Sequence, residues 1–407
     1  MTGAHRPRIV IATQSVEGNP PALRLLKICA EFGDVTVITQ HKGPDSAGGV
    51  GFRRIIPRRE WLCRGLRALC RHAGKLLPAR VREKWIRGYT EEALGLLHQG
   101  RCFKKTWKAH ALRPELLVLD GAEYMTTALS LARRTGAALV YYVHEMFPNQ
   151  RAHYSAALTA WMCRLEREGC RRASHVIVQH HLWGKLLRRR YRISAAKFIE
   201  VTPSPDPEVP LSASGSDGLL SLYYHGLYTP GRGLEVLIRG VALVPGVVLE
   251  LRGIGDYEKE LVKISRESGA EDRIRFLPPL DPEELPGSAR GYDLGVMTGT
   301  NEHLNGRMAA GMKLYQNISA GIALFGYRAI TVRNRVRIHG IGFAYDGRSP
   351  EKVAETLREC VQNRDRVTRA RVRAAEVARS YFNSDMQYAR LRQVIAAALA
   401  SAPNTHP

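Results

Sequence analysis

Short stretches of this chain place glycines and cations where an apolar run gives way to a helical pattern. One of them, YYHGLYTPGRGLEVL, spans residues 223–237. Gly226 ends its apolar run, and Gly231 stands directly before Arg232, where the helical pattern begins. Unpaired backbone N–H groups and the positive end of a helix favour an anion at such a junction, and a guanidinium matches the geometry of phosphate. The stretch indicates a phosphate-binding loop, with an ordinary glycine turn as the alternative.

A second stretch, NGRMAAGMKLYQNISAGIALFGY (residues 305–327), puts a charge and an amide on an element that is otherwise apolar. Asn305 opens the stretch, Lys313 falls near the N-terminal turn of the predicted helix, and Gln316 follows on the same side. A lysine buried without a partner is costly, so Lys313 needs a carboxylate neighbour, an exposed end or a ligand phosphate. Because Lys313 and Arg232 both follow strands of one predicted sheet, together they predict a diphosphate ligand.

A third junction, LRGIGDYEKEL (residues 251–261), carries Gly253 and Gly255 after an apolar run. It resembles a shortened dinucleotide-binding loop that lacks the third glycine. A tight turn and a close approach of a ligand to the backbone explain these glycines equally well.

In the first half of the chain, YYVHEMFPNQ (residues 141–150) places His144 and Glu145 directly after a strand pattern. Ligands of doubly wound sheets bind at the carboxyl ends of the strands. A histidine at that edge can donate a hydrogen bond to a substrate or act as an acid or base. Gly18 and Glu302 are further candidates for residues of the cleft.

Alternating apolar runs and helical periods position these residues. A strand at residues 7–13, a helix at residues 21–33 that ends at Gly33, and a strand at residues 34–40 form a βαβ unit with parallel strands. Further strands are predicted at residues 114–121, 137–145 and 174–179, and then at 219–226, 247–255, 273–280, 292–299 and 321–327. Helices of the second half are predicted at residues 233–244, 258–269 and 349–363, with a last helix at 381–400. The expected fold class is α/β, with two doubly wound Rossmann-like domains facing a cleft.

A stretch rich in proline, serine and glycine divides the two halves and is typical of a linker. We therefore expect an N-terminal domain over residues 1–204, a linker over residues 205–218 and a C-terminal domain over residues 219–380.

Length and composition narrow the class of protein. A chain of 407 residues is too long for one ordinary core and predicts two domains. No apolar run reaches the length of a membrane-spanning helix and no signal-peptide pattern is present, so we expect a cytoplasmic protein. The 7 cysteines form no CxxC pair, and the 14 histidines form no ligand-spaced cluster with them. Reduced, buried thiols and no metal site are expected.

The net charge of +23 indicates an anionic partner. Residues 53–113 alone hold 17 Lys and Arg against 4 Asp and Glu, together with three tryptophans and many leucines. This composition suits helices that lie on an anionic membrane surface, and a solvated basic face on core-packed helices is the alternative. Nucleic acid is not expected as a partner because no nucleic-acid-binding motif is present.

Four stretches resemble the retaining nucleotide-sugar glycosyltransferases of family 4, which have the two-domain GT-B fold. In chain order they are NPPALRLLKICAEFGDVTVIT, VYYVHEMFPNQ, YHGLYTPGRGLEVLI and GMKLYQNISAGIALFGY. The similarity extends over nearly the whole chain. It implies that the helix at residues 381–400 returns to the N-terminal domain, which binds the acceptor, while the C-terminal domain binds the donor.

The resemblance also implies roles for single residues. Arg232 and Lys313 would hold the donor phosphates and His144 would contact the transferred sugar, which makes these three the candidate catalytic residues. Gln316 stands where the family carries a glutamate that binds the nucleotide ribose. The expected donor-binding set is Gly226, Gly231, Gly253, Gly255, Leu314 and Gln316.

The chain departs from the family pattern at Leu227, where the family often has arginine, and at Gln316. We expect transfer of a sugar from a nucleoside diphosphate sugar to an acceptor hydroxyl, with retention and with no cofactor or metal required. The expected acceptor is a glycan or a lipid-linked sugar at the inner face of the plasma membrane. The alternatives are a catalytically impaired binding partner of another transferase, and a nucleotide-sugar epimerase that would use Glu145 and Glu302 as acid and base.

Overall fold

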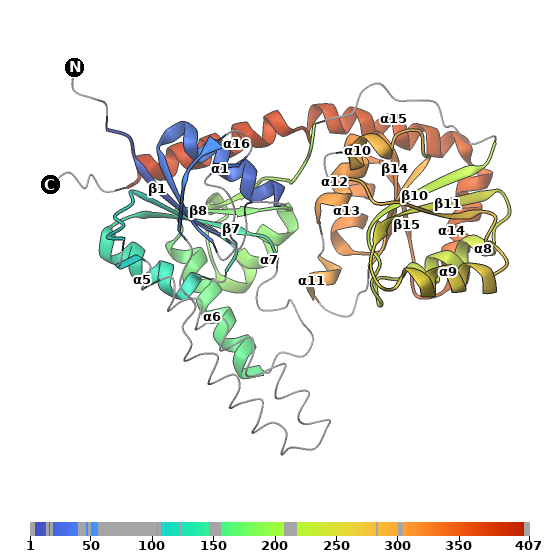
Figure 1. Ribbon diagram of the computed structural model, residues 1–407, viewed down its shortest axis with the longest axis horizontal. Helices are drawn as coiled ribbons and strands as arrows, with labels where there is room; N and C mark the ends of the chain where they lie inside the picture. The colour runs from blue at the N-terminus through green and yellow to red at the C-terminus, as the bar shows by residue number, and fades with distance from the viewer. Residues whose placement is uncertain are drawn as a thin grey trace, which may run out of the picture. The chain divides into compact units, whose positions relative to one another are not determined.

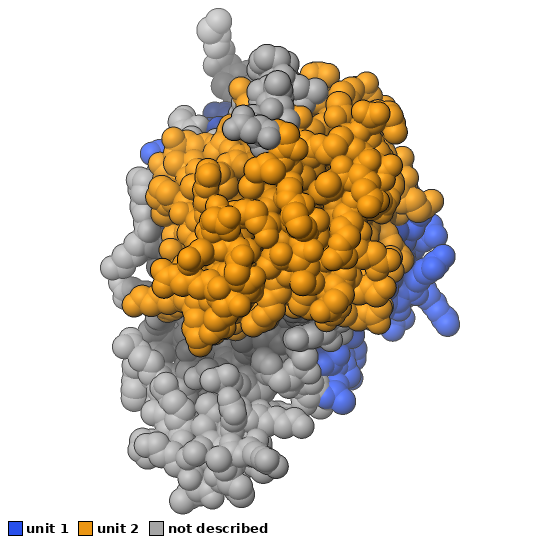
Figure 2. Space-filling model, turned by 90° about the vertical axis from the view of Figure 1, so that its right-hand side faces the viewer, with its two compact units in different colours: residues 1–201, 388–407 blue, residues 202–387 orange. Residues whose placement is uncertain are grey.

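The computed structural model divides into two compact units, which are coloured separately in Figure 2. Unit 1 comprises residues 1–201 and 388–407, and unit 2 comprises residues 202–387. The domain boundaries expected from the sequence lie at residues 204 and 380, a few residues away from these limits. The structure describes residues 5–13, 16, 19–39, 46–47, 50–55, 104, 107–108, 110–122, 124–145, 156–206, 218–281, 284–299, 304–308 and 310–402.

Unit 1 is built on a seven-stranded sheet in the order β5-β2-β1-β6-β7-β8-β9. All of its neighbouring strands pair in parallel. The strands are β1 (Arg8–Ala12), β2 (Asp34–Ile38), β5 (Arg53–Ile55), β6 (Leu116–Asp120), β7 (Ala138–Val143), β8 (His175–Val178) and β9 (Phe198–Glu200), and a separate hairpin pairs β3 (Ser46–Ala47) with β4 (Val50–Gly51). The reversal of strand order between β1 and β6 makes this a doubly wound sheet, as predicted.

The helices that the structure describes in unit 1 are α1 (Pro20–Phe32), α5 (Met125–Thr135), α6 (Ala156–Arg172), α7 (His181–Tyr191) and most of α16 (Ser384–Ala400). Helix α1 begins where the Asn19 side chain accepts the backbone N–H of Ala22, and it ends at Gly33, whose N–H donates to the carbonyl of Cys29. A Cβ at Gly33 would lie 2.0 Å from the carbonyl oxygen of Pro7, so only glycine fits between the helix and β1.

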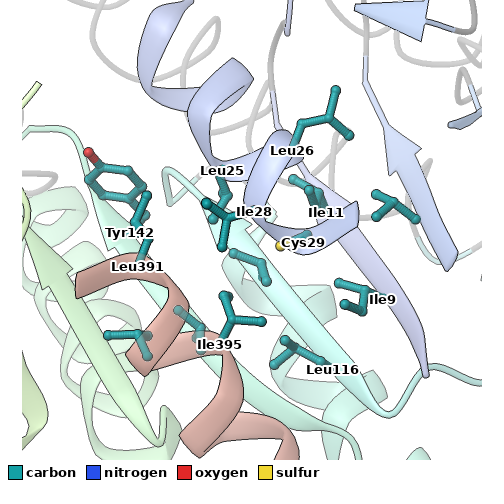
Figure 3. Close-up of a cluster of buried hydrophobic side chains, with 14 of the residues drawn as sticks. Ile9, Ile11, Leu25, Leu26, Ile28, Cys29, Leu116, Tyr142, Leu391 and Ile395 are labelled. Atoms are coloured by element: carbon teal, nitrogen blue, oxygen red, sulfur yellow. The ribbon is translucent and has the colours of Figure 1, made fainter. Parts of the chain in front are cut away.

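Helix α16 completes the core of unit 1, although it is far from the rest of the unit in sequence (Figure 3). Leu391 and Ile395 of α16 lie in one buried cluster with Ile9 of β1, Leu25 of α1 and Leu116 of β6. Since none of these five side chains is exposed, the last helix is an integral part of this unit.

Unit 2 is built on a six-stranded sheet in the order β12-β11-β10-β13-β14-β15, again with every pair parallel. Its strands are β10 (Leu220–Leu227), β11 (Val247–Ile254), β12 (Ile274–Leu277), β13 (Leu294–Met297), β14 (Ala323–Tyr327) and β15 (Gly342–Tyr345). Its helices are α8 (Leu234–Ala242), α9 (Glu258–Glu267), α10 (Leu285–Ser288), α11 (Leu304–Arg307), α12 (Met312–Ser319), α13 (Ile330–His339), α14 (Pro350–Gln362) and α15 (Arg364–Ser380). Figure 1 shows α8 and α9 on one side of this sheet and α12 and α15 on the other.

The sequence-based strands and helices of unit 2 are confirmed, but α13, β15, α15 and the short helices α10 and α11 were missed. The last helix was predicted to begin at residue 381, but α16 begins three residues later, at Ser384. Residues 381–383 form the turn after α15. The α/β class with two doubly wound sheets is confirmed, and the cleft between them stays a prediction.

Residues 56–103, most of the basic segment, lie outside the described residues, so its assignment to a membrane surface stays a prediction. Among the residues that the structure describes, none of the helices has the length and apolar content needed to span a bilayer.

Candidate functional site

The carboxyl end of β10 and the loop after it form the first part of the site, in unit 2. Gly226, with φ 138°, lies so close to Lys313 that an added Cβ would be 2.8 Å from the Lys313 Nζ. Gly231 and Gly233 have φ values of 76° and 79°, in the left-handed region that glycine adopts without strain. These two glycines turn the chain into α8, and Gly233 is the N-cap of that helix.

Lys313 lies on the first turn of α12, which begins after the N-cap residue Gly311. Its ammonium nitrogen is 3.7 Å from the centroid of the Tyr224 ring, a cation–π contact. Lys313 makes no ion pair with a carboxylate in the described part of the chain. Burial, and then the positive charge of Arg232, lower the pKa of Lys313 to about 7. The lysine is therefore held in an environment that lacks a counter-charge.

Arg232 is exposed on the loop before α8, where its Nε donates to the Thr229 hydroxyl at 2.9 Å. Its charge acts on Lys313 and on Tyr224, whose pKa is raised by burial and lowered in part by Arg232. Tyr224 is thus in contact with Lys313 and within range of the Arg232 charge. The structure brings Arg232 and Lys313 to one edge of the sheet, and a shared anionic ligand would relieve their mutual repulsion.

Gln316, one turn after Lys313, is buried, and its Oε1 accepts a 3.0 Å hydrogen bond from Nε2 of His225. Burial, and then the charge of Lys313, lower the pKa of His225 to about 3, so this imidazole is neutral. In the described part of the chain the buried Nδ1 of His225 has no hydrogen-bond partner. With Nε2–H donating to the Gln316 carbonyl, Nδ1 is an unused acceptor beside the cation.

Sequence reasoning missed Tyr224 and His225, because both lie within the apolar run YYHG that was assigned to a strand. A signal was present: three aromatic residues precede Gly226 at the end of a strand. Alternating side chains on β10 point to opposite faces, so which of them meets α12 depends on the sheet order.

The remaining donor-binding candidates are explained by packing. A Cβ at Gly253 would lie 2.0 Å from the Gly226 carbonyl oxygen, and one at Gly255 would lie 2.1 Å from the Tyr228 carbonyl oxygen. Both glycines therefore allow β11 and its loop to approach the β10 loop closely, which favours the tight-turn alternative. The Leu314 side chain is fully buried in the core. Ligand contacts at these residues stay predictions.

In unit 1, the carboxyl ends of four neighbouring strands carry a chain of polar side chains. The Thr13 hydroxyl donates to Oδ2 of Asp120 at 2.6 Å, and Nε2 of His144 bonds to Oδ1 of the same carboxylate. Nδ1 of His144 pairs with the Gln179 side-chain amide at 3.1 Å. His144 also stacks on Tyr142, with ring centroids 4.5 Å apart. Both ring nitrogens of His144 are therefore engaged within unit 1.

Asp120, Thr13 and Gln179 were not singled out from the sequence, although each directly ends or follows a predicted strand. The neighbouring candidate Glu145 is exposed. Gly18 and Glu302 lie outside the described residues, and Asn305 is described only as part of the α11 backbone.

In the described part of the chain, His180, His181 and Glu200 are the residues whose types and positions could hold a metal ion. His180 does not fit this role, because its Nδ1 already accepts the backbone N–H of Leu182 at 3.1 Å. A neutral imidazole that accepts through Nδ1 carries its proton on Nε2, which leaves no lone pair for an ion. The expectation that no metal is required stays a prediction.

Comparison with known families places unit 2 among enzymes that transfer sugars. Residues 216–379 match the family model described as glycosyl transferases group 1. This segment contains β10 to β15 and both cations of the site. The chain therefore contains a glycosyltransferase domain, which confirms the class of enzyme expected from the sequence. A comparison with curated proteins finds no match.

Three solved structures show the particular architecture that this chain shares. The HepE protein of Anabaena, in complex with UDP and glucose, has a TM-score of 0.68 at 16% identity and covers 97% of this chain and 100% of its own. The sucrose-phosphate synthase of Thermosynechococcus elongatus has a TM-score of 0.69 at 14% identity, with 97% and 100% coverage. WaaG, a glycosyltransferase involved in lipopolysaccharide biosynthesis, has a TM-score of 0.58 at 13% identity, with 97% and 100% coverage. At these identities the likeness concerns the fold.

Proposed function

We propose that this glycosyltransferase moves a sugar from a nucleoside diphosphate sugar to an acceptor hydroxyl, and that Lys313 and Arg232 bind the donor diphosphate. One observation carries the proposal. A partly buried ammonium lies on the first turn of a helix, within reach of a second cation's field, and without a carboxylate partner in the described residues. The diphosphate supplies the missing negative charge.

The chemistry follows from the charge that develops on the leaving group. When the bond between the sugar and the diphosphate breaks, negative charge accumulates on the diphosphate oxygens. Fixed cations and helix N-termini at that position stabilise the transition state more than the ground state. Lys313 and Arg232 offer two cations, and α12 adds its N-terminal N–H groups. We therefore propose that these groups take the place of a metal ion.

The network around His144 supports retention of the anomeric configuration. An inverting transfer needs a general base that removes the acceptor proton on the face opposite the leaving group. His144 is the histidine that the resemblance places against the transferred sugar, but its Nε2 pairs with Asp120 and its Nδ1 pairs with Gln179. Because this ring has no open nitrogen, we propose that an oxygen of the departing diphosphate takes the acceptor proton instead. The acceptor then attacks from the face that the diphosphate leaves, which yields retention.

Two features support a choice of first substrates. The structure of HepE was solved with UDP and with UDP-glucose, so uridine diphosphate sugars are the first donors to test. WaaG takes part in lipopolysaccharide biosynthesis. Together with the strongly basic segment at residues 53–113, this supports a lipid-linked or polysaccharide acceptor at the inner membrane surface.

A thermal-shift series tests the donor site. Nucleoside diphosphates and their sugars should raise the melting temperature of the unaltered chain, because a ligand that binds only the folded state stabilises it. Lys313→Ala should abolish the shift. The matched control Lys259→Ala removes the same charge from an exposed position on α9 of unit 2 and should leave the shift intact. The proposal fails if no nucleoside diphosphate stabilises the unaltered chain, or if both variants respond alike.

Leu227 favours a second candidate, a donor-binding protein without transfer activity. It is 48% exposed at the end of β10, where the resemblance leads one to expect an arginine. Donor hydrolysis separates the two functions, since an active transferase loses some sugar to water when no acceptor is present. Tight binding of a donor with no release of its sugar, across all donors that bind, would favour the second function.

A further inference from the structure

Unit 2 carries a groove away from the donor loops, between the end of α13, the face of α15 and the beginning of β15. Its volume is about 740 Å³, and Val336, Gly342 and Phe343 are among the residues that line it. A smaller cavity of about 370 Å³ adjoins the groove, and these three residues and Arg366 line both. Volumes of this size suit a ligand rather than a few waters.

Arginines form the rim of the groove. Arg366, Arg369 and Arg373 follow one another at spacings of three and four on α15, which places them on one face of that helix. Arg337, at the end of α13, lies across from them. Arg366 pairs with Glu359, and Arg373 pairs with Glu376 at 2.9 Å.

Two of these arginines have no such partner. Arg337 and Arg369 are exposed and make no ion pair in the described part of the chain. The groove thus presents an excess of positive charge, held by guanidinium groups that match phosphate geometry.

Aliphatic side chains accompany this charge. Val372, which lines the groove between Arg369 and Arg373, is 44% exposed, and Val336 lines the groove from α13. The Phe343 ring forms a buried floor, and the Arg366 guanidinium lies 4.8 Å from its centroid. Arginine stems can cover apolar surface while their charged ends reach outward. The groove therefore offers an apolar interior under a cationic rim.

We propose that this groove binds anionic phospholipids at a membrane surface. A phospholipid has both features that the groove would recognise, a phosphate for Arg337 and Arg369 and acyl chains for Val336 and Val372. A soluble phosphate would leave the aliphatic side chains in water. A protein partner is less well matched, because exposed aromatic anchors typical of protein interfaces are not among the described residues that line the groove. The contact is separate from the donor site and does not depend on it.

Vesicle co-sedimentation of the full chain tests the proposal, with phosphatidylcholine vesicles compared with vesicles that contain phosphatidylglycerol. Each basic residue at an anionic surface strengthens binding by roughly fivefold, so the double variant Arg337→Ala/Arg369→Ala should bind about 25-fold more weakly. Val372→Ser, at an exposed lining position, should also bind several-fold more weakly, without any change in charge. The control Arg188→Ala/Arg189→Ala removes the same charge from exposed positions on α7 of unit 1 and should bind as the unaltered chain does.

Three results would overturn the proposal. An equal loss in the α7 control would show that only the total charge matters. Unchanged vesicle binding in both groove variants would leave the groove to an acidic protein or to no ligand. Displacement from vesicles by millimolar glycerol phosphate at constant ionic strength would assign the arginines to a soluble anion. Circular dichroism of each variant keeps loss of binding separate from loss of folding.

Discussion

The two sheets of this glycosyltransferase differ in the partners of the charged side chains at their carboxyl edges. In unit 1, Asp120 is buried and its two oxygens are bonded to Thr13 and His144. In unit 2, Lys313 has a tyrosine ring and a repelling arginine for neighbours. At the edge of unit 1 the buried charge has hydrogen-bond partners within the unit, whereas at the edge of unit 2 the cation has no negatively charged neighbour among the described residues.

This difference separates two kinds of functional residue. A satisfied network fixes the position of a side chain and contributes to folding. An unsatisfied cation costs folding free energy, and a ligand that restores the missing charge recovers that cost as binding. We therefore expect changes in unit 1 to appear mainly in stability, and changes in unit 2 mainly in donor binding and rate.

The largest effect is expected at Lys313. Removing one group that stabilises developing negative charge lowers kcat by about 10²–10³-fold, so Lys313→Ala should lower kcat/KM to this extent. The release of nucleoside diphosphate in a coupled assay measures it. Lys313→Arg keeps the charge and should lose much less, and a kcat/KM for Lys313→Ala near the original value would contradict the proposed site.

Breaking the network of unit 1 should act on stability instead. Asp120→Asn replaces one accepting oxygen by a donor, which leaves either Thr13 or His144 unmatched. The free energy of unfolding should fall by about 1–3 kcal/mol, the usual cost of an unsatisfied buried polar group. Urea denaturation measures it, with Thr13→Val as a milder partner. If Asp120→Asn also weakened binding of the nucleoside diphosphate, the contrast between the two edges would not hold.

A smaller effect is expected at Arg232, because this side chain is exposed and water competes for it. A hydrogen bond to a charged group contributes about 1.5 kcal/mol at the lower end of its range, so Arg232→Ala should weaken donor binding about tenfold. Titration calorimetry with the nucleoside diphosphate measures the change. Arg239→Ala, at the far end of α8, the helix that follows the Arg232 loop, serves as the control.

Close to neutral pH, the pH dependence of binding should be the smallest of these effects. The pKa of Lys313 is about 7 in the empty site, and a bound diphosphate raises it, so binding takes up a proton above pH 7. Donor affinity should be full below pH 7 and fall by up to about tenfold per pH unit above it, until the pKa of the bound state is reached. Lys313→Arg stays protonated and should give a flat profile. A flat profile in the unaltered chain would show that the lysine is already charged when empty.

The sequence predicted those parts of the fold whose pattern is local. Apolar runs such as the one before Gly226 identified the strands, and the glycine turns with Arg232 and Lys313 identified the donor loops. Helix α13 was missed because arginines interrupt its apolar period. One of them, Arg335, is buried with its guanidinium 4.7 Å from the Phe382 ring, a contact between residues far apart in sequence.

The partners of the site residues could not be predicted in the same way. His144 was identified from its position after a strand, but its bond to Asp120 depends on β6 lying beside β7. Likewise, the bond between His225 and Gln316 depends on α12 following β13, the strand beside β10. Strand order is a property of the assembled sheet, and no local period in the sequence encodes it.

Because α16 is translated last but belongs to the core of unit 1, the order of synthesis affects how the two units fold. Residues 202–387 are all translated before Leu391 and Ile395, so the sequence of unit 1 is completed last, although most of it is made first. Until α16 has emerged from the ribosome, the nascent sheet of unit 1 lacks the two side chains that cover its apolar face. Incomplete cores of this kind are the usual targets of chaperones and the usual start of aggregation. A stalled or truncated translation product would therefore harm the half of the molecule that was made first.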